Sequence, residues 1–504
     1  MNNAVTKPVV VRFAPSPTGC LHIGGVRTAL YNYLMAKQTG GRFILRIEDT
    51  DATREVPGAD QYIIDSLKWC GITFDEGYGI GGDAAPYRQS ERKTIYHGYA
   101  QDLIRLGAAY YAFDTAEETA AMNARDEKYT HATRMSMRNS LSLPKDISDA
   151  LLNSGAPFVI RQKIEPGKTV VVNDVIRGTP SYDTTLLNDQ VLMKSDGMPT
   201  YHFANVVDDH EMEITHVLRG EEWLNSTPLH VLLYDAFGWD KPTFAHLPLI
   251  LKPLVNTIKV NSSGKLSKRD GAIFGIPVVP TEWYGADGHY PGFDTEGYFP
   301  DVLLNFLAIL SWSPGNNEEI MTLDRMIETF DISKVSKAGA RFNIDKLNFF
   351  NKMKIKNMPV SDLIPFVRKY LPDGLSAEFT TDKHLASVIM AMRERVTTLK
   401  DFAPLAPFLF CDEMVYDAVM VDKHHVRARE IAATVYDKIV GIDSTQWNDE
   451  VLKNAIESIE DFSNKTYMAA LRMITTGCTS GPHVYEVMGA MGKPITLNRL
   501  KKFM

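Results

Sequence analysis

Residues 9–30 place one imidazole beside two glycines, a combination that can bind phosphate. His22 can donate a hydrogen bond to phosphate oxygens as they are displaced. Gly24 and Gly25 lack a Cβ, so a ring or a sugar can lie directly on the backbone. These glycines match neither the dinucleotide fingerprint GxGxxG nor the Walker pattern GxxxxGK[ST]. On chemistry alone, a structural histidine at a helix start is an equally good interpretation.

The residues around His22 predict the strand, loop and helix with which open α/β sheets bind phosphate at a helix N-terminus. Residues 9–11 are three valines, which predict a buried parallel strand. Two prolines and Gly19 end this strand in a loop. From Val26 onward, apolar residues recur at three- and four-residue steps, so the sequence predicts a helix with one apolar face.

Other polar residues lie where such a sheet gathers ligands. Residues 42–47 alternate polar and apolar side chains as a strand does, and they end in the acidic run 48–51. An acidic turn that caps the next helix is an equally good interpretation of that run. Residues 262–271 form a glycine-flanked basic loop, and most such loops are solvated. Arg219 lies close to two glutamates, and an arginine beside acids usually forms an ion pair.

Residues 12–30, RFAPSPTGCLHIGGVRTAL, resemble the first signature of the class I aminoacyl-tRNA synthetases in the form carried by glutamyl-tRNA synthetases. His-Ile-Gly-Gly stands where the class signature has His-Ile-Gly-His, and glutamyl enzymes commonly lack that last histidine. Residues 262–271, SSGKLSKRDG, resemble the second signature, Lys-Met-Ser-Lys-Ser, in its glutamyl form. The resemblance covers essentially the whole chain.

The resemblance implies an aminoacyl-tRNA ligase. It would activate L-glutamate with ATP to glutamyl-adenylate and transfer the glutamyl group to the 3′-terminal adenosine of tRNA(Glu), releasing AMP and pyrophosphate. The residues implied as catalytic are His22, Lys265 and Lys268. Those implied for ATP are Gly24, Gly25, Ser267 and Lys268, and those for glutamate are Arg12, Ala14, Ser16, Glu48, Tyr201, Asn205 and Arg219.

Within that set, the resemblance implies separate partners for the charged groups of glutamate. Glu48 would hold the α-ammonium group, which suits a fixed carboxylate. Arg12 and Arg219 would clasp the side-chain carboxylate, with the Tyr201 hydroxyl beside them. Two guanidiniums and no acceptor make glutamine a poor fit.

No metal ligation by the protein itself is expected. Some relatives carry a zinc site of Cys and His, but Tyr111 and Phe113 occupy the approximate places of its first two cysteines, so we predict no zinc. Mg²⁺ is required and would be held by the ATP phosphates. Asp208 and Asp209 are interpreted as helix-capping acids rather than metal ligands.

The predicted fold class is α/β, with several domains in 504 residues. A Rossmann-like parallel-sheet catalytic domain would be split by an insertion that binds the acceptor end of tRNA, and an all-α anticodon-binding region would follow. Residues 125–138 are predicted to be helical, and residues 199–210 to return to the sheet. The expected boundaries are 1–112 and 201–260 for the two catalytic halves, 113–200 for the insertion, 261–345 for the signature loop and stem-contact region, and 346–504 for the helical region.

Composition limits the other functional classes. A net charge of −8 lowers the prospect of a pure RNA-binding module, although local basic patches can still bind RNA. No apolar run reaches the roughly 18 residues of a membrane span, and the N-terminus lacks the pattern of a secretory signal. The four scattered cysteines predict reduced thiols. We therefore expect a cytoplasmic protein without a membrane partner, and a monomer as in many family members.

Three alternatives remain at this stage. A truncated paralogue that glutamylates a tRNA base lacks the helical C-terminal part. Small nucleotidyltransferases share a His-x-Gly-His loop, but they would leave the C-terminal helices unexplained. A non-catalytic RNA-binding module would be favoured by loss of the signature residues, which are intact. The residues that read the anticodon, and the choice between tRNA(Glu) alone and tRNA(Gln) as well, cannot be derived from the sequence.

Overall fold

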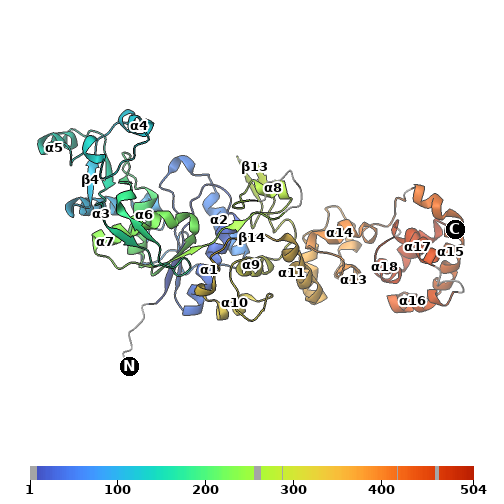
Figure 1. The fold of residues 1–504 in the computed structure, drawn as a ribbon. Coiled ribbons are helices and arrows are strands. Elements are labelled where there is room, and N and C mark those ends of the chain that lie inside the picture. Colours follow the sequence, from blue (N-terminus) through green and yellow to red (C-terminus); the bar gives the residue numbers. More distant parts are fainter. Residues whose placement is uncertain (1–7, 255–262, 287, 417, 460–464, 479) are drawn as a thin grey trace, which may run out of the picture. The chain divides into compact units, whose positions relative to one another are not determined.

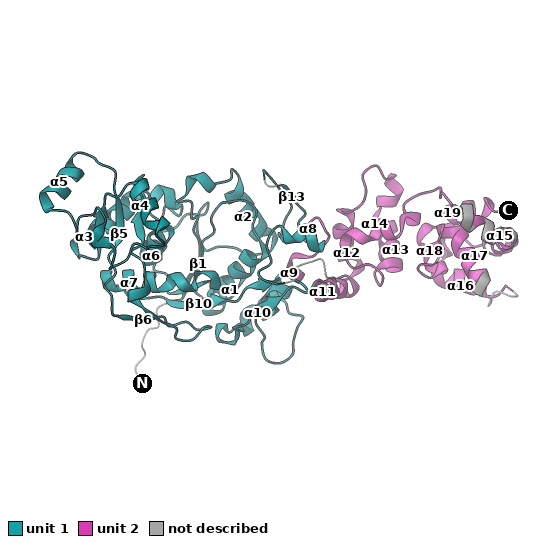
Figure 2. Cartoon of the chain, turned by 45° about the horizontal axis from the view of Figure 1, so that its top comes forward, with its two compact units in different colours: residues 1–292, 303–343 teal, residues 293–302, 344–504 magenta. Residues whose placement is uncertain are grey.

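The computed structural model describes residues 8–254, 263–286, 288–416, 418–459, 465–478 and 480–504. The chain divides into two compact units, Met1–Gly292 with Leu303–Asn343 and Phe293–Val302 with Ile344–Met504 (Figure 2). The first unit mixes strands and helices, whereas the described part of the second is helical (Figure 1). The predicted α/β part followed by an all-α part is therefore confirmed. The boundary predicted between 260 and 261 lies outside the described residues.

The core of the first unit is built on parallel strands. Strands β1 (Val10–Phe13), β2 (Arg42–Leu45) and β3 (Glu76–Gly77) form one parallel sheet, and β9 (His216–Gly220) pairs with β10 (Thr243–Leu247) in another. The backbone N–H of Thr215, just before β9, donates to the carbonyl of Val10 at 2.9 Å, which joins the two. The strands predicted at 9–11 and 42–47 are thus present, with shifted ends.

Helix α1 (Ile23–Thr39) begins three residues earlier than the apolar pattern predicts. The side chain of His22 caps it, because Nδ1 accepts a hydrogen bond from the backbone N–H of Gly24 at 3.0 Å. The helix ends at Gly40, which has a left-handed φ of 64°. Apolar periodicity therefore located the helix, but the cap decided where it starts.

The remaining parts of the first unit surround these parallel strands. Strands β4 (Ala109–Ala112), β5 (Val159–Gln162) and β8 (Val191–Met193) form an antiparallel sheet, and β6 (Thr169–Val171) pairs with β7 (Ser181–Asp183). Strand β11 (Ile250–Leu251) pairs with β14 (Ala340–Arg341), and β12 (Trp283–Gly285) with β13 (Gly288–Tyr290). The helices are α2 (Ala59–Trp69), α3 (Lys93–Arg105), α4 (Ala116–Ala124), α5 (Lys145–Asn153), α6 (Tyr201–Glu211), α7 (Thr227–Phe237), α8 (Asp270–Phe274), α10 (Leu323–Thr329) and most of α9 (Pro300–Ile309).

Two predictions of local structure are wrong. Residues 125–138 are not a helix, because Asp126 has a positive φ of 57° and only Arg134–Ser136 forms a single 3₁₀ turn. Side chains there bond to nearby backbone, as Thr133 Oγ1 does to the N–H of Thr130, and such bonds compete with a helix. Residues 199–210 do not form a strand but supply α6. A short apolar run fits a buried helix as well as a strand.

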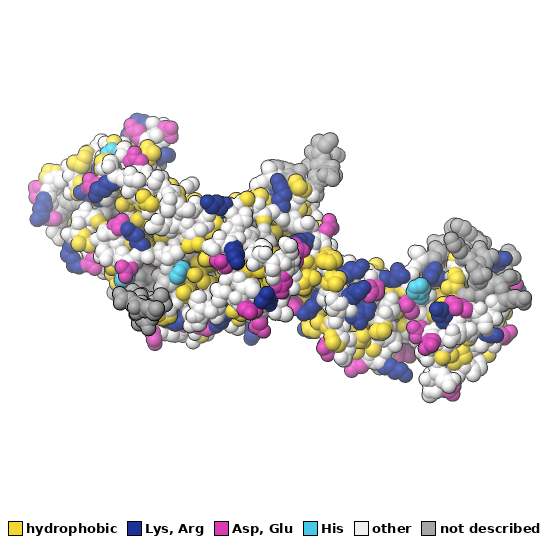
Figure 3. All heavy atoms as spheres, turned by 60° about the horizontal axis from the view of Figure 1, so that its bottom comes forward, with side chains coloured by type: hydrophobic (Ala, Val, Ile, Leu, Met, Phe, Trp, Pro, Cys, Tyr) yellow, Lys and Arg dark blue, Asp and Glu magenta, His cyan; other side chains and the backbone are white. Residues whose placement is uncertain are grey.

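The second unit packs helices around an apolar interior. Its helices are α11 (Ile344–Asn357), α12 (Val360–Arg368), α13 (Asp382–Met392), α14 (Phe402–Leu405), α15 (Ala418–Ile439), α16 (Asp449–Glu457), α17 (Lys465–Thr476), α18 (Val484–Met491) and α19 (Lys493–Lys501). On the face shown in Figure 3, basic and acidic side chains are interspersed. Across the described ranges, no helix combines the length and the apolar character needed to cross a membrane.

Candidate active site

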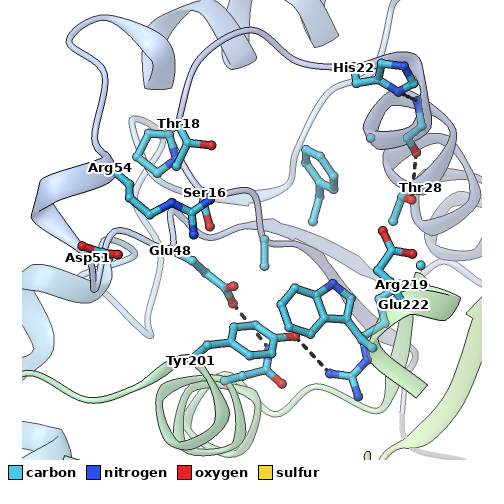
Figure 4. A pocket seen from close by; sticks show the side chains of 18 of the residues that line it. Ser16, Thr18, His22, Thr28, Glu48, Asp51, Arg54, Tyr201, Arg219 and Glu222 are labelled. Atoms are coloured by element: carbon cyan, nitrogen blue, oxygen red, sulfur yellow. Dashed lines mark hydrogen bonds between the residues drawn. The ribbon is translucent and has the colours of Figure 1, made fainter. Parts of the chain in front are cut away.

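A cavity of about 1010 Å³ lies in the first unit, where β1 and β2 end and α1 begins. Glu48 and Tyr201 lie on one side of it and His22 on the other (Figure 4). The structure brings all the residues predicted for catalysis, ATP or glutamate into this one lining: Arg12, Ala14, Ser16, His22, Gly24, Gly25, Glu48, Tyr201, Asn205, Arg219, Lys265, Ser267 and Lys268.

His22 lies in the lining of this cavity and carries one hydrogen-bond donor on its ring. Its Nδ1 accepts from the N–H of Gly24, so Nδ1 carries no proton and the hydrogen of the neutral ring lies on Nε2. In the described structure Nε2 is buried and has no hydrogen-bond partner. Burial, with added repulsion from Lys265 and Lys268, lowers the pKa of His22 to about 3. At neutral pH the ring therefore acts as a neutral N–H donor rather than as a cation.

A side chain on either glycine after His22 would have to displace a neighbouring side chain. A Cβ on Gly25 would lie 2.6 Å from Cδ1 of Leu21, and one on Gly24 would lie 3.2 Å from Nδ1 of His22. Both positions are in the first turn of α1, where the helix dipole favours a negative group. This end of the cavity is suited to phosphate.

Arg219 holds a charge that its immediate partners do not neutralise. Its Nε donates to Nε2 of His246 at 3.0 Å, Nη1 to the Tyr201 hydroxyl at 3.1 Å, and Nη2 to Oγ1 of Thr227 at 2.9 Å. Nη1 also lies 3.3 Å from Nδ1 of His230. In the described part of the chain these partners are all neutral, so the expected ion pair with a nearby glutamate is not formed. Arg219 is 5% exposed as a residue, and its guanidinium is available to a carboxylate.

Asp208 and Asp209 are not helix caps, which corrects the interpretation from sequence. They lie in the last turns of α6, whereas capping acids favour the first turn, and both are buried. Asp209 accepts from Nε and Nη2 of Arg12 at 2.9 and 3.2 Å and from Arg46 at 2.8 Å. Asp208 accepts from Nε of Arg92 at 2.7 Å. These acids hold buried arginines in place, and Arg12 keeps Nη1 for a ligand.

Glu48 lies at the edge of the same buried network. Its Oε1 accepts from Nη2 of Arg46 at 3.0 Å and from Nδ2 of Asn205 at 3.4 Å, which leaves Oε2 for a ligand. Burial raises the pKa of Glu48, and Arg46 and Arg12 oppose that shift. An added cation in the cavity would favour the charged carboxylate in the same way.

Replacing Arg46 by methionine is expected to lower the free energy of unfolding by about 3–5 kcal/mol, because the carboxylates of Glu48, Asp208 and Asp209 would stay buried without it. Urea denaturation of the full chain measures the change. The control is Arg325→Met, which removes a partly exposed arginine and should leave the unfolding free energy nearly unchanged. Equal losses in both variants would contradict the role given to Arg46.

The basic loop contributes its lysines in two different ways. Nζ of Lys265 is paired with Oε1 of Glu222 at 2.6 Å. Nζ of Lys268 lies 3.5 Å from the place that a Cβ on Gly19 would take, so it faces the first loop. Ser267 donates its N–H and hydroxyl to Oδ2 of Asp270 at 2.8 and 2.6 Å. Its hydroxyl therefore stabilises the start of α8, and only its position in the lining favours contact with ATP.

Sequence reasoning missed several residues of the lining. Trp223 packs against Tyr201 with ring centroids 4.2 Å apart, and Glu222 is the partner of Lys265. Lys194, from the end of β8, donates to the carbonyl of Thr50 at 2.8 Å. The available signal was weak: Trp223 follows Arg219 and two glutamates in the sequence, but nothing in its spacing indicates a cavity.

The positions compared with zinc ligands are filled by packed aromatic rings. Tyr111 and Phe113 both contact Phe158, with ring centroids 5.1 and 6.4 Å apart. Among the residues that the structure describes, no group of three or more His, Cys, Asp or Glu side chains could hold a metal ion. The absence of zinc remains a prediction.

Known proteins are similar to both units. Residues 8–349 match the family described as tRNA synthetases class I (E and Q), catalytic domain, and residues 361–504 match an anticodon binding domain. The glutamate–tRNA ligase of Bacteroides thetaiotaomicron is 46% identical over 506 residues, 98% of each chain, and that of Porphyromonas gingivalis is 45% identical over 513 residues, 99% of each. A solved glutamate tRNA ligase of Elizabethkingia meningosepticum, in complex with its amino acid, has a TM-score of 0.91, 43% identity and 99% coverage of both chains.

Proposed function

The chain belongs to the glutamate–tRNA ligases among the class I tRNA synthetases, and we propose that its cavity joins L-glutamate to ATP as glutamyl-adenylate. The glutamyl group then passes to the 3′-terminal adenosine of tRNA(Glu), with release of AMP. The observation that carries this proposal is one cavity lined by His22 and Lys268 together with Arg219, whose partners are neutral.

The charges of glutamate find complementary groups in the cavity. Its side-chain carboxylate binds Arg219 and the remaining Nη1 of Arg12. The Tyr201 oxygen already accepts from Arg219, so its hydroxyl hydrogen is free to donate to the same carboxylate. The α-ammonium group binds Oε2 of Glu48, whose other oxygen is held by Arg46 and Asn205. Glutamine would bring an amide N–H₂ to guanidinium donors, so it is rejected. Ala14 and Ser16, in the loop after β1, would line the glutamate site.

The phosphates of ATP occupy the end of the cavity at α1. Nε2–H of His22 and the ammonium of Lys268 donate to phosphate oxygens, and Gly24 and Gly25 let the nucleotide approach the backbone. The glutamate α-carboxylate attacks the α-phosphate in line, and pyrophosphate leaves with the α–β bond electrons. The contribution of the protein is placement and charge stabilisation, without a covalent enzyme intermediate. Lys265 must leave Glu222 to take part.

Magnesium would enter with the nucleotide. The described residues offer no cluster of three metal-ligating side chains, so they do not fit a protein-built Mg²⁺ site. Mg²⁺ readily takes phosphate oxygens and water as ligands, as it does on ATP. No step of the proposal therefore uses a protein-bound metal, and no zinc is needed.

The wider organisation follows from the same proposal. Residues 1–112 and 201–260 would be the catalytic halves, 113–200 would receive the acceptor end of tRNA, and 261–345 would contact its stem. Residues 346–504 would bind the anticodon, which is supported by the match of residues 361–504 to an anticodon binding domain. That match disfavours the truncated paralogue. We further propose a cytoplasmic monomer.

ATP–pyrophosphate exchange tests the function. We expect exchange that requires glutamate together with tRNA(Glu), and none with glutamine or aspartate. Exchange with glutamate alone would keep the activation chemistry but remove the dependence on tRNA. Absence of exchange with folded protein under every condition would overturn the proposed function.

A further inference from the structure

A buried chain of hydrogen bonds leads from the predicted insertion to Arg219. Asp174, which follows β6, bonds through Oδ2 to Nδ1 of His246 at 2.5 Å and to the backbone N–H of His246 at 3.0 Å. On its other side, Nε2 of His246 accepts from Nε of Arg219 at 3.0 Å. The side chains of Asp174 and His246 are fully buried. The carboxylate, the imidazole and the guanidinium therefore lie in one line that ends at the cavity.

The partners of His246 allow only one form of its ring. Arg219 is a donor only, so Nε2 must carry a lone pair, and the Asp174 carboxylate is an acceptor only, so Nδ1 must carry the hydrogen. His246 is therefore neutral, and burial lowers its pKa in agreement with that state. A doubly protonated ring would turn a second N–H towards Arg219 and break the contact.

We propose that Asp174 and His246 are positioning residues that fix Arg219 for the side-chain carboxylate of glutamate, and thereby maintain the preference for glutamate over glutamine. This inference rests on the proposed function. His246 orients the guanidinium without neutralising it, which an acidic partner would do. Asp174 acts one step further away, since it holds the ring in the form that can accept from Arg219.

The turn after β6 makes Asp174→Asn a decisive variant. Oδ1 of Asp174 accepts from the backbone N–H groups of Ile176 and Arg177 at 2.9 and 2.7 Å. An asparagine would keep its oxygen on these two donors and turn its N–H₂ towards His246, whose backbone N–H then also loses its bond to Oδ2. Nδ1 of His246 must then accept, its hydrogen moves to Nε2, and that N–H faces the N–H of Arg219.

Kinetics of exchange provide the first test. In Asp174→Asn, the KM for glutamate should rise about 10- to 100-fold, the usual cost of losing a residue that orients a binding group, while the KM for ATP stays unchanged. The kcat/KM for glutamate should fall accordingly, which narrows its margin over glutamine. An unchanged KM for glutamate would overturn the proposal.

Two substitutions of His246 separate positioning from stability. In His246→Gln, Oε1 can still accept from Arg219, although the contact with Asp174 is lost. In His246→Asn, the side-chain N–H₂ can still donate to Asp174, but nothing reaches Arg219. We expect the KM for glutamate to rise in the asparagine variant and to stay near the wild-type value in the glutamine variant. If KM instead follows the melting temperature in both variants, the role is merely structural and the proposal fails.

A spectroscopic readout is independent of activity. With ¹⁵N-labelled histidine, the His246 signals are assigned by their loss in His246→Gln. We expect an unprotonated Nε2 and a protonated Nδ1 in the wild-type protein, and the reverse in Asp174→Asn. The wild-type form persisting in Asp174→Asn would overturn the inference. If the wild-type protein shows this form but no glutamate-dependent exchange, the proposed function fails and the hydrogen-bond chain stands.

Discussion

Replacing His22 by asparagine is expected to lower kcat for glutamate-dependent exchange by about 10²–10³-fold, the usual effect of removing one donor from a developing negative charge. Asparagine is a strong N-cap, so its Oδ1 can still accept from Gly24 and α1 keeps its start. The asparagine side chain is too short to place a donor at the position of the Nε2–H group of His22. Exchange kinetics and thermal denaturation together should therefore show a large loss of rate with little change in melting temperature.

The matched control is His22→Gln, whose amide N–H₂ can occupy the place of Nε2 but whose side chain caps poorly. It should retain more of the rate and lose about 1 kcal/mol of stability. The opposite order, with the asparagine variant faster, would contradict the assignment of His22 as a donor to phosphate.

The pH dependence checks the protonation state of His22. With its pKa lowered to about 3, the ring is neutral above that value. The pH profiles of kcat for the wild-type protein and for His22→Asn should therefore have the same shape near pH 6.5. A cationic His22 would give a rate that falls as pH rises through its pKa. Such a fall, abolished by the substitution, would show that the ring acts as a cation.

The sequence was informative where chemistry depends on short, ordered motifs. The loop before α1 and the basic loop identified residues that the structure brings to one cavity, although they come from distant parts of the chain. Their individual roles remain proposals. Strand and helix types near the first signature could also be predicted, because valine runs and apolar periodicity are local signals.

Other features depend on contacts that no local pattern encodes. Asp208 and Asp209 resemble capping acids in sequence, yet their partners Arg12, Arg46 and Arg92 come from earlier segments of the chain. Residues 125–138 contain helix-favouring residues, but their polar side chains bond locally instead of allowing a helix. Tertiary pairing therefore decided the first outcome and local side-chain bonds decided the second, and the charge and helix propensity of a single sequence show neither.

The chain linking Asp174, His246 and Arg219 is a further case of this kind. Its members lie far apart in sequence and belong to no shared motif, so only the fold places them in line. The same geometry explains why Arg219 does not pair with a neighbouring glutamate. Glu222, which also lines the cavity, is instead paired with Lys265. The charge of the pocket thus follows from which acids have other partners.

Because Glu222 pairs with only one of the two lysines of the basic loop, we predict different effects for the two. Lys268→Met is expected to lower kcat by about 10²–10³-fold, because it removes a charge aimed at the leaving pyrophosphate. In the described structure the Lys268 ammonium has no ion-pair partner, and it faces the first loop across the cavity. Lys265→Met should cost less, since Lys265 must first break its pair with Glu222.

Rates of single-turnover adenylate formation and the KM for ATP distinguish the two lysines. If Lys268 acts mainly in the transition state, kcat and kcat/KM for ATP fall together and KM changes little. If Lys265→Met loses as much rate as Lys268→Met, then Lys265 leaves Glu222 whenever ATP is bound, and the partition seen without ligand does not carry over to the reaction. A larger loss in Lys268→Met would instead mean that the contacts seen without ligand already assign the two lysines different functions: Lys265 pairs with Glu222, and Lys268 acts on the leaving group.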